Sequence, residues 1–199
     1  MSDPITALPD DVRALVARIH AAPTVAVVAV SGAGGAALAW LLAVPGASRT
    51  LLEGRVPYAR SALAELLGGE PAEFVSRDTA VAMARAARVR ALTLGRLDHA
   101  GVPAVGLACT ATIATDRAKR GDHRCWIALA SREGVATYGL VLAKGARDRA
   151  GEEAVVSRLA LHALARGCGV GGLAGDFAGE AAALALRPSE RVEEGSAPP

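Results

Sequence analysis

The chain has few aromatic residues and no long apolar run. Phe, Trp and Tyr make up 3% of its 199 residues, whereas hydrophobic residues as a whole make up 52%, so a core must be built from Ala, Val and Leu. No apolar run approaches the roughly 20 residues of a membrane-spanning helix. The acidic first residues, MSDPITALPDD, also lack the charged and then apolar layout of a signal peptide. We therefore expect a cytoplasmic protein that does not interact with membranes.

Cysteine is also scarce, and the net charge is small. The three cysteines, Cys109, Cys125 and Cys168, are widely spaced, which argues against a disulfide framework and fits a reducing compartment. His123 and Cys125 alone do not make a metal site, so we expect no metal and no cofactor. The formal net charge is +2, and no basic stripe is interleaved with aromatic residues. Nucleic-acid binding is therefore not expected.

What the chain does have is an alternation of apolar strand and helix patterns that predicts one α/β domain over residues 1–186. Continuous apolar runs at 25–30 and 102–110 are typical of strands that are buried on both faces. Further strands are expected at 49–58, 124–131 and 135–143. Helices are expected at 10–21, 36–43, 59–67, 76–97, 154–166 and 177–186. Residues 187–199 have little apolar content and predict a flexible tail.

Ser31 lies at the end of the first apolar strand, before a turn that contains Gly32, Gly34 and Gly35. Free N–H groups at the start of a helix attract anions, and glycine permits close approach of a ligand. Ser31 is either a cap of the following helix or a nucleophile presented at the carboxyl end of a strand. The turn by itself matches neither a dinucleotide fingerprint nor a P-loop.

A polar and basic segment, 110–124, follows the strand over 102–110. If the two strands are parallel and adjacent, this segment lies at the same edge of the sheet as Ser31. Guanidinium groups bind phosphate in bidentate fashion, which predicts a small phosphorylated or nucleotide ligand. The alternative is a solvated basic loop. The residues of interest are Thr110, Thr112, Arg117, Lys119, Arg120, His123 and Arg124.

The order of these motifs resembles the C-terminal domain of the competence-induced protein A (CinA) family, the nicotinamide-mononucleotide deamidases. The family pattern E-S-C-T-G-G is matched at Ser31, Gly34 and Gly35. Pro45-Gly46-Ala47-Ser48 is similar to P-G-S-S, and Gly54-Arg55-Val56-Pro57-Tyr58 is similar to G-x-V-x-Y. These matches fall in register without a gap over roughly 40 residues, which is more specific than any one glycine turn.

The resemblance extends over about residues 10–167. The segment 75–84, VSRDTAVAMA, repeats V-S-x-E-x-A-x-x-M-A closely, and Gly145-Ala146-Arg147 resembles a G-D-R motif before the last long helix. The resemblance implies a three-layer α/β/α fold with a mixed, mostly parallel sheet, assembled as a homo-oligomer. It also implies hydrolysis of the carboxamide of nicotinamide mononucleotide. Ser31 would be the nucleophile and Tyr58 an active-site partner, with Gly34 and Gly35 in the substrate loop. Gly32 and Arg147 are further candidate substrate-binding residues.

The chain departs from the family pattern at its general base. The family lysine aligns with Leu63, which cannot take a proton from Ser31. Lys119 is one replacement, if its pKa is depressed. A Cys109 thiolate assisted by His123 is another route to an amidohydrolase. The remaining hypothesis is a nucleotide-binding module that kept the pocket and lost the base.

Overall fold

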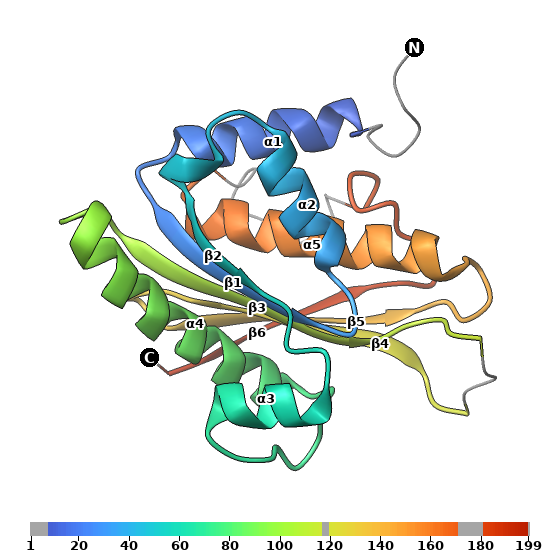
Figure 1. The fold of residues 1–199 in the computed structure, drawn as a ribbon. Coiled ribbons are helices and arrows are strands. Elements are labelled where there is room, and N and C mark those ends of the chain that lie inside the picture. The colour runs from blue at the N-terminus through green and yellow to red at the C-terminus, as the bar shows by residue number, and fades with distance from the viewer. Residues whose placement is uncertain (1–7, 117–119, 171–180, 199) are drawn as a thin grey trace.

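The computed structural model describes residues 8–116, 120–170 and 181–198, and is built on a six-stranded sheet (Figure 1). The strand order is β2-β1-β3-β4-β5-β6. The strands are β1 (Val25–Ser31), β2 (Leu51–Arg55), β3 (Ala104–Thr112), β4 (His123–Ala130), β5 (Val135–Leu142) and β6 (Val192–Ala197).

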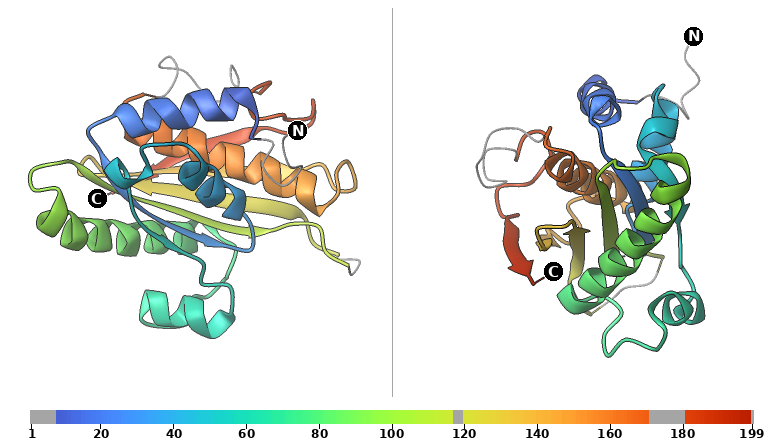
Figure 2. Two further views of the ribbon diagram at one scale, coloured as in Figure 1. Left: turned by 45° about the horizontal axis from the view of Figure 1, so that its top comes forward. Right: turned by 90° about the vertical axis from the view of Figure 1, so that its left-hand side faces the viewer.

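Helices cover both faces of this sheet, so the expected three-layer arrangement is confirmed (Figures 1 and 2). One face carries α1 (Asp10–Ala21), α2 (Gly35–Ala43) and α5 (Arg149–Gly167). The other carries α4 (Arg77–Asp98), with α3 (Arg60–Leu67) beside it. None of the helices in the described ranges combines the length and apolar character that a membrane span needs.

The sheet is only partly parallel, so the prediction of a mostly parallel sheet is wrong. β1 pairs in parallel with β2 and with β3, whereas β4, β5 and β6 are each added in antiparallel fashion. The connection explains one of these antiparallel pairs. The turn at 131–134 joins β4 directly to β5, and a turn this short can connect only antiparallel strands.

The C-terminal segment differs from the sequence-based expectation of a flexible tail over 187–199. Val192–Ala197 form β6, which pairs with β5 at the edge of the sheet. Arg166 forms an ion pair with Glu194 at 2.9 Å, and the Arg77 guanidinium donates to the Ser196 carbonyl. The helix expected over 177–186 is not formed by residues 181–186, which adopt turns and coil, and 177–180 lie outside the described residues.

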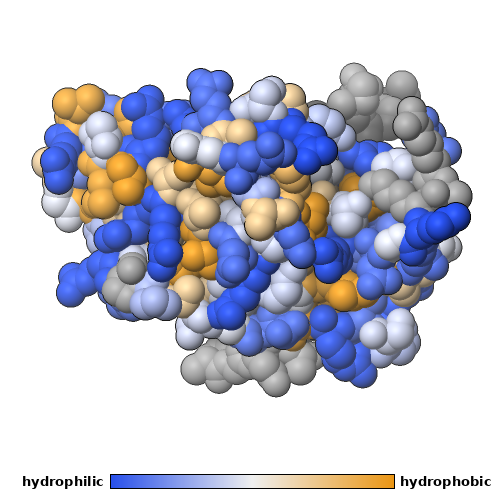
Figure 3. All heavy atoms as spheres, turned by 90° about the horizontal axis from the view of Figure 1, so that it is seen from below, coloured by the Kyte–Doolittle hydropathy of each residue, from blue (hydrophilic) through white to orange (hydrophobic). Residues whose placement is uncertain are grey.

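Small residues in the central strands allow the lower helix layer to pack closely on the sheet. A Cβ atom built at Gly106 of β3 would lie 2.2 Å from the Ala84 carbonyl oxygen and 2.2 Å from the Arg88 nitrogen. The backbone of α4 therefore rests directly on β3. On the outer surface of this lower layer, apolar areas are separated by hydrophilic side chains (Figure 3).

We predict that Gly106→Ala lowers the free energy of unfolding by about 2 kcal/mol, because α4 must move away from β3. Gly69→Ala is the matched control, since a Cβ at Gly69 meets nothing within 4 Å. Urea denaturation of both variants measures the difference. Equal stability of the two variants would contradict the close packing of α4 on β3.

Candidate functional site

Ser31 ends β1 and faces Thr110 across the parallel pair with β3. Gly32 and Gly34 have φ values of 83° and 96°, a left-handed conformation that suits glycine. A Cβ at Gly32 would lie 1.9 Å from the Ala111 carbonyl oxygen, so the turn crosses directly over the end of β3. The N-cap of α2 is Gly34, with no side-chain cap, and the interpretation of Ser31 as a helix cap is therefore wrong.

The Ser31 hydroxyl opens onto a cavity of about 360 Å³ between β1, β3 and α3. Its oxygen donates a hydrogen bond to the Pro57 carbonyl at 3.0 Å, which is the one partner of this hydroxyl among the described residues. Thr110 also lines the cavity, and its hydroxyl donates to the Phe74 carbonyl. Leu63 forms an apolar wall and is 1% exposed. The serine therefore lies in a cavity, and the position of the family lysine is a buried leucine.

A second cavity, of about 640 Å³, adjoins the first, and Gly32 and Tyr58 line both. The Tyr58 side chain is 68% exposed. Arg149, the first residue of α5, lies beside it. The Arg149 guanidinium donates to the Ala114 carbonyl at 2.8 Å and to the Gly32 carbonyl at 3.3 Å, and it lies 3.5 Å from the Tyr58 hydroxyl. An aromatic ring and a cation therefore form one side of the combined cleft.

The carboxylate of Glu153 occupies the amino-terminal end of α2. It accepts hydrogen bonds from the Gly34 N–H at 3.0 Å and from the Ala36 N–H at 2.9 Å. The Ser157 hydroxyl donates to the same carboxylate at 3.1 Å. A negative charge at the start of a helix is stabilised by the free N–H groups and by the helix dipole. Two of the N–H groups in the Gly34–Gly35 turn region are thus already bound to an anion from the protein itself.

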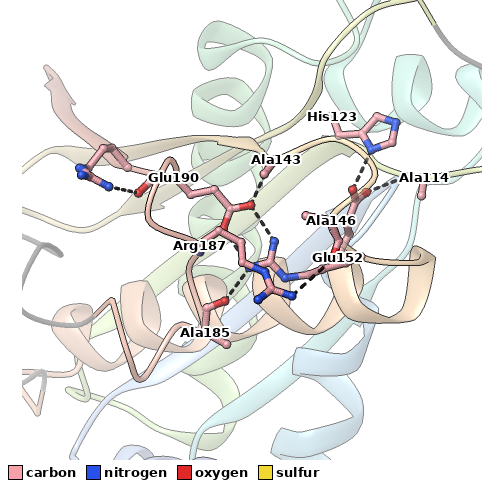
Figure 4. A network of polar contacts seen from close by, with 10 residues as sticks. Ala114, His123, Ala143, Ala146, Glu152, Ala185, Arg187 and Glu190 are labelled. Carbon is pink, nitrogen blue, oxygen red and sulfur yellow. Dashed lines mark hydrogen bonds and ion pairs between the residues drawn. The ribbon is translucent and has the colours of Figure 1, made fainter.

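The neighbouring residue, Glu152, holds the segment that follows β3. This fully buried carboxylate accepts a hydrogen bond from the Ala114 N–H at 2.7 Å and lies 2.7 Å from His123 Nδ1 (Figure 4). The His123 ring is therefore already engaged by Glu152.

Burial raises the pKa of the Cys109 thiol well above its ordinary value, and the nearby Cys125 and Glu153 act in the same direction. A thiol kept protonated is a poor nucleophile, which disfavours a cysteine hydrolase.

The predicted basic residues do not gather around Ser31 among the described residues. Arg117 and Lys119 lie outside the described residues. Arg120 is exposed and lines neither cavity. Thr112 ends β3 half-buried, with Arg124 opposite it in β4.

Arg147 is bound to the C-terminal segment. Its guanidinium forms a bidentate pair with Glu190, at 2.6 and 2.9 Å, and donates to the Ala185 carbonyl at 2.6 Å. Glu190 also accepts from the N–H groups of Ala143 and Arg187 (Figure 4). This pair anchors the chain that leads into β6.

The three cysteines are free and buried, in agreement with the prediction of no disulfide framework. In the described part of the chain, no three His, Cys, Asp or Glu side chains come together as a group that could hold a metal ion.

Sequence reasoning missed Arg149, Glu152 and Glu153, which the sequence places in a charged segment before the expected helix over 154–166. The one local sequence feature that indicates the true start of this helix is Asp148. Its carboxylate caps α5 by accepting from the Gly151 N–H at 2.8 Å. Recognising this cap would have moved the helix start to Arg149. No local pattern links Glu153 to Gly34.

We predict that Glu153→Ala lowers the free energy of unfolding by about 2 kcal/mol, because the N–H groups of Gly34 and Ala36 lose their acceptor. Glu65→Ala removes an exposed carboxylate of α3 and is the control. Chemical denaturation of both variants tests this expectation. A loss in Glu153→Ala no larger than that in the control would contradict it.

We predict a pH-dependent contribution from the Arg147–Glu190 pair. Burial raises the pKa of Glu190, but hydrogen bonds from Arg147, Arg187 and Ala143 and the charge of Arg147 outweigh it, so the pKa is lowered overall. A lowered pKa stabilises the folded state above the ordinary glutamate value of about 4.3, and this stability is lost as the pH falls through the lowered value.

Glu190→Gln should therefore cost about 2 kcal/mol of stability at pH 7. The gap to the wild type should narrow in acid below the ordinary glutamate pKa. Thermal unfolding of both proteins between pH 7 and pH 3 measures this stability difference. A difference that is constant with pH would contradict a lowered pKa of Glu190 in the folded state.

Comparison with known proteins identifies the family. Residues 11–167 match the family model of the CinA C-terminal domain. The competence/damage inducible protein CihA from Agrobacterium tumefaciens is 22% identical, with a TM-score of 0.62 over 85% of this chain and 99% of that chain.

Two CinA superfamily proteins have similar folds. The protein from Escherichia coli is 21% identical, with a TM-score of 0.59 over 82% of this chain and 92% of that chain. The protein from Enterobacter cloacae is 20% identical, with a TM-score of 0.59 over 85% of this chain and 97% of that chain. No curated protein matches. Because the family model matches well over half of its length, the chain belongs to the CinA C-terminal domain family.

Proposed function

We propose that the cleft beside Ser31 binds a pyridine nucleotide or a related phosphorylated amide, and that Ser31 does not hydrolyse this ligand efficiently. The main support for this proposal is the surroundings of the Ser31 hydroxyl. It donates to the Pro57 carbonyl, and the wall beside it is the buried Leu63. A serine hydroxyl without a neighbouring base is a weak nucleophile.

Binding is supported by the groups that line the cleft. The exposed ring of Tyr58 offers a face on which a pyridinium ring can stack, with a favourable cation–π contribution. The Arg149 guanidinium lies beside it and is suited to a phosphate group. The Ser31 hydroxyl lies farther in and can hydrogen-bond to a carboxamide.

The contacts of Glu153 disfavour hydrolysis. Its carboxylate lines the larger cavity and holds two N–H groups of the glycine turn region. The same contacts take up N–H groups that would otherwise stabilise an oxyanion.

The second candidate function is deamidation of nicotinamide mononucleotide with Ser31 as nucleophile. Its support is the presentation of Ser31 in a cavity, at the carboxyl end of a parallel strand and beside Tyr58. This reaction needs a base. Lys119, the replacement suggested by the sequence, lies outside the described residues, and the proposal assigns it no role.

Calorimetric titration with nicotinamide mononucleotide, together with an assay of released ammonia, separates the two functions. We expect saturable binding, a loss of affinity of about 10-fold or more in Tyr58→Ala, and ammonia release that is equal in the wild type and in Ser31→Ala. The control variant Tyr138→Phe changes the other tyrosine, which lines neither cavity of the cleft. Ammonia release that depends on Ser31 would establish the hydrolase instead, and the absence of binding would refute the proposal.

A further inference from the structure

A third cavity, of about 610 Å³, lies at the end of the sheet opposite to Ser31. It is formed where β3 begins and β4 ends, against the second half of α4 and the end of α5. Ser31 is the last residue of β1, whereas Thr24 of this cavity directly precedes the strand, so the full length of β1 separates the two sites. The cavity is therefore distinct from the cleft described above.

Arginine side chains dominate the polar lining of this cavity. Arg88, Arg96 and Arg132 line it together with the imidazole of His99, and Glu133 is its one acidic lining residue. Glu133 lies 3.3 Å from Arg132, and both of these side chains are largely exposed. Arg88 and Arg96 form no ion pair with any described residue. The charge of the lining therefore remains positive after this pairing.

Arg88 provides the second and independent observation. Its Nε is the one buried side-chain nitrogen or oxygen in the described residues that has no hydrogen-bond partner. Burying an N–H group of a charged side chain without an acceptor is costly, and native proteins rarely leave such groups unpaired. The position of Arg88 is also fixed, because the backbone of α4 at Arg88 packs directly on Gly106. Because Arg88 lines the cavity, a ligand bound there can approach this guanidinium, whose internal hydrogen bonding is incomplete.

We propose that this cavity binds the phosphate group of a small phosphorylated molecule. Guanidinium groups with several N–H donors recognise phosphate oxygens, and Arg88, Arg96 and Arg132 supply three of them. The Ser131 hydroxyl also lines the cavity, but it donates to the Glu133 carboxylate at 2.7 Å and is not counted among these donors. The cavity also has apolar walls, formed by Leu92, Val102, Pro103 and Val105, which suit the organic part of such a ligand.

The arginines place the phosphate within the cavity. Arg88 and Arg96 both belong to α4, whereas the end of α5, at Gly167, Cys168 and Gly169, lines the opposite wall. The phosphate therefore lies on the α4 side, next to Arg88, and the organic part extends toward α5.

Inorganic pyrophosphate is the probe for this site, and ¹H–¹⁵N spectra of the full chain report where it binds. At constant ionic strength we expect saturable shifts of the amides of Gly95, Gly101 and Ser131, with Gly32 and Gly34 unchanged at the same concentrations. Arg88→Met should weaken binding by at least about 10-fold. Arg13→Met is the matched control, because Arg13 is exposed on α1 and lines none of these cavities.

The test remains decisive if Arg88→Met does not fold, since the exposed Arg132 can be changed to Met instead, with an expected weakening of about 3-fold or more. No saturable shift in the wild type, or wild-type affinity in the variant, would overturn the proposal. Shifts confined to the Gly32–Gly35 turn would also overturn it. Tyr58→Ala should bind pyrophosphate normally, so failure here is distinguishable from failure of the proposed function.

Discussion

The site depends on the contact between the Glu153 carboxylate and the N–H groups of Gly34 and Ala36, which joins residues 119 and 117 positions apart. Asp148 caps α5 and so fixes where this helix begins. The next two carboxylates, on Glu152 and Glu153, then point in different directions, because successive residues of a helix are about 100° apart. Glu153 holds the turn after β1, and Glu152 holds the segment after β3.

These two loops form the cleft, so its shape is set by charges inside the protein rather than by a ligand. The start of α2 would otherwise be a general anion site. With a carboxylate already bound there, these N–H groups are not free to bind an anionic group of a ligand. Arg149 reinforces this arrangement, since its guanidinium links Ala114 and Gly32, one residue from each loop. The same helix start therefore supports the fold and shapes the proposed ligand site.

The sequence predicts the elements of this fold well and their long-range contacts poorly. Periodicity and caps place α1, β1 and α4, where Ser76 accepts from the Thr79 N–H as its position suggests. The strand Val192–Ala197 was not predicted, because VEEGSA has no apolar alternation and is held by pairing with β5. The prediction of a mostly parallel sheet was wrong for a related reason. The short turn fixes the direction of β5 against β4, but the pairings of β4 with β3 and of β6 with β5 depend on which strands meet, and a local pattern does not contain that information.

The same contrast between local patterns and long-range contacts applies to the candidate site. Ser31, Tyr58 and Thr110, which are expected from their place at strand ends and from a motif, line one cavity. Glu153 and Arg149 were not expected, because each acts through contacts made only after α5 packs on α2. Arg147 was expected to bind substrate, but in the structure its guanidinium is engaged by Glu190. A basic residue in a sequence motif carries no indication of which carboxylate will neutralise it.

The most direct test of this account is amide hydrogen exchange at Gly34 and Ala36, measured by NMR in the free protein and with saturating nicotinamide mononucleotide. The account predicts that both amides exchange slowly in the free protein and keep that protection when the nucleotide binds, because Glu153 remains their acceptor. Rapid exchange in the free protein, or protection that arises only with the nucleotide, would show that the ligand and not Glu153 holds these groups.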